Sequence, residues 1–289
     1  MFASSIFSGF VASAPFQQGF GAIAYILIAM IALALVETLI PLHARDRRSA
    51  RHLLPNLALT FLTFATNLIF NTALVLTLVW LQGFGFGVLH TFALAPWQMV
   101  AITVLALDLS FYLLHVAMHK NPALWRYHQV HHCDVMLDVT TTIRQHPGES
   151  VVRYLGLAAT AIALGASPAA FMVYRVWSTL QGLIEHANIS LPRPLDAALA
   201  LVIASPNMHK VHHSRDPRLT DTNYGNITSL WDRLFLTFTP ARTGTDIDYG
   251  LEGLDASRDQ STWGLLVLPW RHDRRAGRTQ TGESPRAQH

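Results

Sequence analysis

The stretch from Asp108 to Glu149 decides the fold. It contains the segments D-L-S-F-Y-L-L-H-V-A-M-H (108–119), L-W-R-Y-H-Q-V-H-H (124–132) and T-T-I-R-Q-H-P-G-E (141–149). Two of its histidines are four residues apart, and three more follow an H-x-x-H-H pattern. Because residues three or four apart share one face of a helix, each set predicts a row of imidazoles one turn apart. These five residues are His115, His119, His128, His131 and His132.

A second H-x-x-H-H pattern lies far downstream, at His209, His212 and His213. Imidazoles so closely spaced would repel each other if protonated, whereas a cation that takes their lone pairs stabilises them. Neutral imidazole is a good ligand for iron, zinc, copper or nickel. The eight motif histidines exceed the roughly three protein ligands of a catalytic zinc ion. They therefore favour two metals, each held by four or five nitrogens, and two adjacent redox metals indicate activation of O₂ against an unreactive C–H bond.

Composition predicts an integral membrane protein. The chain has 289 residues, of which 51% are hydrophobic and 13% charged, against roughly 25% charged in soluble domains. The net charge of +3 is small and the basic residues are clustered, which indicates membrane topology rather than nucleic-acid binding. The single cysteine, Cys133, excludes an intrachain disulfide, and we expect a small buried side chain there.

Three apolar runs are long enough to cross a bilayer, at Gly19–Ile40, Leu53–Trp80 and Trp97–Met118. Two shorter runs, 151–164 and 169–183, predict a helical hairpin that either crosses or re-enters. The loop after the first run is basic, so the positive-inside rule places it, and the histidines, on the cytoplasmic face. The basic residues of this loop are Arg45, Arg47, Arg48 and Arg51.

The predicted fold is an all-α integral membrane helical bundle with a cytoplasmic cap that carries a histidine-rich dimetal site. Residues 1–96 form the N-terminal transmembrane part, 97–240 the catalytic domain, and 241–289 a C-terminal extension that ends in a disordered basic tail. Asn67 and Asn71 share a helical face and are expected to contact another helix, a polar channel being the alternative. Five further histidines lack ligand spacing, and we expect them at the surface. They are His43, His52, His90, His272 and His289.

The motifs in order, H-x-x-x-H, H-x-x-H-H, R-x-H-P-x-E, H-x-N, H-x-x-H-H, D-x-N-Y-G and W-D, resemble the fatty acid hydroxylase / sterol desaturase superfamily of membrane di-iron enzymes. The resemblance covers roughly Trp97 to Phe238. It implies that the eight motif histidines are metal ligands and that His186 is a ninth. The larger hydroxylases of this family have a further histidine where this chain has Ser190. The role of His146 is open between a ligand and an outer position.

Further polar residues are predicted to support the ligands from outside. Ligating imidazoles usually donate their second N–H to a carboxylate or a carbonyl. Asp108 lies seven residues before His115 on the same helical face, and an ionised carboxylate within an apolar span requires a partner. Arg144 is expected to pair with one of the carboxylates. The alternative role of each of these carboxylates is a helix cap or a surface ion pair. The remaining candidates are Glu149, Glu185, Asn188, Asp221, Asn223 and Asp232.

The resemblance implies an enzyme with two iron ions that uses O₂ and external electrons to hydroxylate a lipid, with desaturation at the same site as the alternative. The electron donor is expected to be a separate protein, because the sequence lacks haem, flavin or Fe–S motifs. A zinc-dependent membrane hydrolase and a membrane carrier of metal or haem are the rivals from other classes. The usual zinc peptidase motif has a glutamate between its histidines, whereas this chain has Val116, Ala117 and Met118 there.

Overall fold

The computed structural model describes residues 8–44, 49–241 and 246–271. Throughout these residues the regular elements are helices. The described residues contain no β-strand, and only three isolated bridges join extended segments. The predicted all-α class is therefore confirmed.

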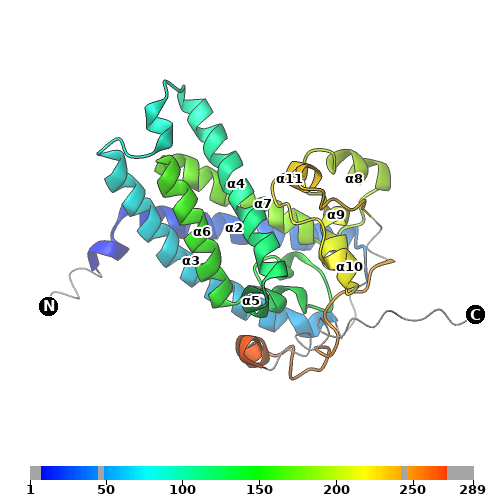
Figure 1. Cartoon of the computed structure of the whole chain (residues 1–289). Coiled ribbons are helices and arrows are strands. Elements are labelled where there is room, and N and C mark those ends of the chain that lie inside the picture. The colour runs from blue at the N-terminus through cyan, green and yellow to red at the C-terminus, as the bar shows by residue number, and fades with distance from the viewer. Residues whose placement is uncertain (1–7, 45–48, 242–245, 272–289) are drawn as a thin grey trace, which may run out of the picture.

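Three long helices form the apolar part of the fold (Figure 1). They are α2 (Ala14–Leu39), α3 (Leu53–Gln82) and α4 (Pro96–Lys120), and each is long and apolar enough to cross a membrane. With 26, 30 and 25 residues, they extend roughly 37–45 Å at 1.5 Å per residue, which exceeds the hydrocarbon thickness of about 30 Å. Their positions agree with the three predicted spans.

The predicted hairpin consists of α6 (Pro147–Leu164) and α7 (Pro168–His186). The turn is sharp because Gly165 adopts a left-handed conformation with φ 69°. Ser167 then caps α7 by accepting a hydrogen bond from the backbone N–H of Ala170. Both helices pack on α4, and α7 also contacts α2 (Figure 1). Neither helix is among the three candidate spans, so whether the hairpin crosses stays a prediction.

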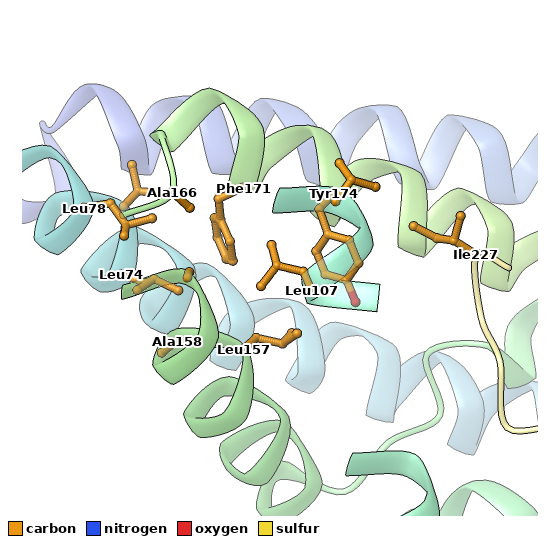
Figure 2. Packing of buried hydrophobic residues seen from close by; sticks show 12 residues of the cluster. Leu74, Leu78, Leu107, Leu157, Ala158, Ala166, Phe171, Tyr174 and Ile227 are labelled. Atoms are coloured by element: carbon orange, nitrogen blue, oxygen red, sulfur yellow. The ribbon is translucent and has the colours of Figure 1, made fainter. Parts of the chain in front are cut away.

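The largest apolar core joins α3, α4, α6 and α7 (Figure 2). Leu74 and Leu78 of α3, Leu107 of α4, Leu157 of α6 and Phe171 of α7 belong to this cluster. All five side chains are buried. This packing fixes the ends of α4 and α7 relative to each other, and both ends carry candidate metal ligands.

The remaining elements are short. Helix α5 (Pro122–His132) follows α4, and α8 to α11 lie together beside α4 and α7 (Figure 1). Most of these helices begin with proline, which suits the first turn of a helix because its missing N–H would have no partner there. The bounds are α8 Arg193–Leu199, α9 Pro206–His212, α10 Pro217–Thr220, α11 Leu230–Leu234 and α12 Thr262–Val267, with 3₁₀ turns at Ser49–His52, Val88–Thr91, Val139–Thr141 and Leu268–Trp270.

One expectation for a histidine outside the motifs is wrong. His52 is buried, and its Nδ1 lies 3.1 Å from the carboxylate of Asp134, while its Nε2 lies 3.4 Å from Asp138. Burial opposes protonation, but the two carboxylates outweigh it and raise the pKa of His52 to about 10. The spacing rule missed this residue because its partners lie some eighty positions downstream.

Other surface expectations have mixed outcomes. His90 is exposed, as predicted, and His43 is half-buried with its ring against Tyr249. The predictions for the loop arginines at 45, 47 and 48, for the basic tail at 272–289 and for His272 and His289 lie outside the described residues.

A glycine substitution tests the hairpin turn. A Cβ at Gly165 would collide with the carbonyl oxygen of Phe86, whereas Gly85, which also has a positive φ, has nothing within 4 Å. Alanine at either position should cost roughly 1–2 kcal/mol of backbone strain. We predict that Gly165→Ala costs about 1–3 kcal/mol beyond that, because of the collision. Thermal unfolding midpoints in detergent micelles measure this, and equal losses for Gly165→Ala and Gly85→Ala would contradict the packing described.

Candidate metal centre

The histidines of four helices form two adjacent groups. In each group one ring nitrogen or equivalent donor atom per residue lies within 4.8 Å of all the others. The first group takes side chains from α4, α5 and α9, and the second from α5, α7 and the end of α9. The first group is His115, His119, His128, His132 and His212; the second is His131, His186, His209 and His213.

Each H-x-x-H-H motif serves both groups. On α5, His128 and His132 enter the first group and His131 the second. On α9 the division is reversed: His212 enters the first group, and His209 and His213 enter the second. The rings of His132 and His213 stack at 4.4 Å across the boundary. The doubled motif therefore places the two groups side by side.

In two of the histidines, the hydrogen bond made by Nδ1, the ring nitrogen on the outside of the centre, fixes the tautomer of the ring. Nδ1 of His115 lies 2.8 Å from the carbonyl oxygen of Tyr224, and Nδ1 of His128 lies 3.0 Å from Glu149. Because a carbonyl or a carboxylate only accepts, each Nδ1 must donate its proton. The Nε2 atoms of His115 and His128, 3.1 Å apart, then face each other as two lone pairs. This contact is not a hydrogen bond, and a cation between the two nitrogens would stabilise it.

The geometry agrees with metal coordination. Neighbouring ligands at about 2.1 Å from a metal and at right angles have nitrogens about 3.0 Å apart. The Nε2 atom of His186 lies 3.1 Å from that of His131, 3.2 Å from that of His213 and 3.1 Å from that of His209. In the first group, Nε2 of His119 and of His212 are buried without a hydrogen-bond partner. The residues therefore fit two metal ions.

Burial favours the neutral form of three imidazoles that lie outside the apolar spans. Burial, followed by the fields of neighbouring histidines, holds the pKa values of His132, His212 and His213 well below the ordinary value. Neutral imidazole is the ligand form. The centre is thus ready to accept metal without first losing protons.

Two predicted carboxylates, Glu149 and Asp221, orient histidines, and a third, Glu185, lies near one without a hydrogen bond to it. Glu149, buried at the start of α6, contacts His128 and is held by Arg153. Asp221 lies 3.3 Å from Nδ1 of His119, and Glu185 lies 3.6 Å from Nδ1 of His209. Backbone carbonyls do the same elsewhere: Gly182 accepts from His186 and Thr222 accepts from His212. Such contacts fix ring orientation and ligand basicity.

Asp108, Asn223 and Asp232 act through the backbone rather than through a histidine. Asp232 accepts hydrogen bonds from the N–H groups of Tyr224 and Gly225, and Asp108 accepts from Ile227 N–H and the indole of Trp231. Asn223 donates to the carbonyls of Met208 and Thr239. Together they hold the loop whose Tyr224 carbonyl orients His115.

Two predicted residues lie in other networks. Arg144 does not pair with any of the four carboxylates considered for it; its Nη1 lies 3.5 Å from Asp134 and bonds to Asn56. Asn188 bonds to the backbone of His43, and its own N–H donates to Glu37. Both positions brace the chain around the centre.

His146 lies apart from both groups. It is the N-cap of α6, where Nδ1 accepts from Gly148 N–H, and its Nε2 bonds to the carbonyl of Leu266. This arrangement favours the outer role over the ligand role that the sequence left open.

Sequence reasoning missed two supporting carboxylates. Glu37 of α2 is buried and accepts hydrogen bonds from the N–H groups of Val139 and Asn188. Asp134, two residues after the H-x-x-H-H motif, bonds to His52 and Asn56. A signal existed for Glu37, because it is the one acidic residue of the first apolar run.

A cavity of about 150 Å³ borders the centre. Its walls come from α2, α3, α6 and α7, and they include Asn67 and Asn71, so the polar face of α3 faces this cavity. At the inner end it is lined by His115 of the first group and His186 of the second. A ligand from the apolar part of the fold could thus reach both groups.

The fold and the site together define a helical membrane protein with a buried, histidine-rich centre that could bind metal ions. The fatty acid hydroxylase family model matches residues 100–237, which contain all nine histidines. This region thus matches the fatty acid hydroxylase superfamily, the family that the histidine motifs resemble.

Several curated relatives are lipid-modifying enzymes. The chain is 31% identical over 182 residues to an alkylglycerol monooxygenase of Caenorhabditis elegans, covering 60% of this chain and 34% of that protein. It is 30% identical over 161 residues to the ornithine lipid hydroxylase OlsE of Rhizobium tropici, covering 54% of this chain and 47% of that protein. A very-long-chain aldehyde decarbonylase of Oryza sativa is 26% identical over 193 residues, 62% of this chain and 29% of that protein. The chain thus spans less than half the length of these relatives, and no solved structure matches it.

Two histidine variants separate a ligand from a cap. We predict that His186→Ala lowers bound metal from two ions per chain to about one, because His186 contacts every other histidine of the second group. His146→Ala should keep both ions and cost about 1 kcal/mol as a lost N-cap. Metal content of the purified variants by mass spectrometry measures this, and loss of an ion in His146→Ala would contradict the assignment.

Proposed function

We propose that this chain is a membrane-bound di-iron oxygenase that uses O₂ and external electrons to hydroxylate a C–H bond of a lipid. The observation that carries the proposal is the pair of all-imidazole groups at the inner end of a cavity bounded by apolar helices. When bound there, two iron ions would supply the activation of O₂.

The site chemistry favours a redox centre over a hydrolytic one. Both groups consist of imidazoles alone. The nearby carboxylates of Glu149 and Asp221 are engaged with histidine Nδ1 atoms, so they orient ligands instead of activating water. A zinc hydrolase needs an available general base beside the metal. These contacts remove Glu149 and Asp221 from that role and leave Glu185, which lines the cavity, as the one carboxylate of the three that such a rival could use.

The residues of the chain have three roles in this proposal. The nine histidines hold the metals. Carboxylates and carbonyls behind five of them, His115, His119, His128, His186 and His212, keep those Nε2 lone pairs directed inwards. Phe111 and Leu157 belong to the cavity wall, where apolar side chains exclude water from the reacting carbon. The substrate would enter sideways from the bilayer between the helices that bound the cavity.

The arrangement in the membrane is part of the proposal. The basic loop after α2 would face the cytoplasm, which places the centre and the α8–α11 cap on that side. Residues 97–240 would form the catalytic unit, 1–96 the anchor and 241–289 an extension. Electrons would come from a separate protein that docks on the cytoplasmic side.

Metal and oxygen dependence test the function directly. We predict about two iron ions per purified chain, and an oxidised lipid product that forms in air with reductant but not under argon. Metal analysis of the protein, with lipid profiling of cells that express it or lack it, measures both. Product masses distinguish an alcohol from an alkene, which separates hydroxylation from desaturation. Zinc in place of iron, or a product that forms without O₂, would contradict the proposal.

A further inference from the structure

An arginine without a counter-ion lines the cavity, far from the histidines. Arg175 lies on α7, within the apolar hairpin. Its Nε is buried without a hydrogen-bond partner, and among the described residues its guanidinium forms no ion pair. A guanidinium whose Nε is buried without a partner is unfavourable unless something compensates its charge.

The surroundings of Arg175 do not compensate its charge. Arg153 is close enough to interact electrostatically with Arg175, but it is also a cation. It is already paired with Glu149. Among the residues that line the cavity only Glu185 is acidic. Glu185 lies ten residues along the same helix, roughly 15 Å away at 1.5 Å per residue, and it contacts Gln181 and His209.

Further hydrogen-bond donors face the same space. Asn67 and Asn71 of α3 line the cavity, and within the described part of the chain no hydrogen bond involves their side-chain amides. α3 and α7 are in contact. The guanidinium offers donors only, and each amide can add a donor through its NH₂ group. The natural complement of the guanidinium is an acceptor-rich anion such as a carboxylate or a phosphate.

We propose that Arg175 binds an anionic group, carboxylate or phosphate, on the lipid that enters this cavity. The proposal rests on the oxygenase function and narrows its substrate to acidic, chain-shaped lipids. His186 follows Arg175 by eleven residues of one helix, so the anchored group and the centre are roughly 16 Å apart along α7. A lipid held by its anionic group at Arg175 therefore needs a chain long enough to cover this separation.

Three probes with the same saturated chain test the proposal: hexadecanoic acid, hexadecyl phosphate and hexadecanol. Binding is measured on the full-length protein in lipid nanodiscs under argon without reductant, so that no turnover occurs. We expect at least one anionic probe to bind more tightly than the alcohol. The tighter of the two anions shows whether a carboxylate or a phosphate is the preferred source of charge.

Variants of Arg175 test whether this side chain is responsible for the preference for an anionic probe. Arg175→Gln should weaken binding of the anionic probe roughly 10- to 100-fold, the range for a charge-assisted hydrogen bond, and leave hexadecanol binding unchanged. Unchanged alcohol binding also shows that the cavity is intact. Arg175→Lys should retain part of the anion affinity. Arg258→Gln, at a side chain that is 87% exposed, should match the wild type.

Two results would overturn the proposal: equal affinity of the wild type for all three probes, or an anion affinity that survives Arg175→Gln. Failure of the oxygenase function is distinguishable, because it would appear as selective, Arg175-dependent binding with no oxidised product after metal, O₂ and reductant are supplied. That outcome would support the anion site and contradict the reaction.

Discussion

The structure depends on one electrostatic constraint: nine imidazoles converge in a buried space with ring nitrogens close together. Where Nδ1 donates to a carbonyl or a carboxylate, as in His115 and His128, the inner nitrogen carries a lone pair and no proton. Such nitrogens 3.1 Å apart repel each other in a medium of low dielectric constant. Bound cations would remove this repulsion, so the arrangement of these histidines is the one expected of a metal-binding protein.

This constraint explains why many buried polar side chains surround the histidines. Each H-x-x-H-H motif contributes to both groups, so α5 and α9 must keep a fixed register with α4 and α7. Asp108 and Asp232 fix the loop that orients His115, and Glu37 ties α2 to the backbone at Val139 and Asn188. Carboxylates buried in this way make each backbone segment adopt one position, and precise placement of ligands is what a dinuclear centre requires.

The sequence predicted what depends on short-range periodicity, and it failed where distant segments pair. Spacings of three and four residues identified the histidine rows, and the apolar runs located α2, α3 and α4 within a few residues. Arg144 and His52 were misjudged because Asp134 and Asn56, which bind them, belong to segments that only the folded chain brings together. The positions of Asp221 and Glu149 behind histidines were expected, but which histidine each contacts needed the tertiary structure.

Anomalous scattering at the iron absorption edge, from crystals of the full-length protein, tests the central claim most directly. The account predicts two separate iron peaks, one enclosed by His115, His119, His128, His132 and His212 and the other by His131, His186, His209 and His213. A single peak shared by both groups, or iron bound away from these histidines, would contradict it.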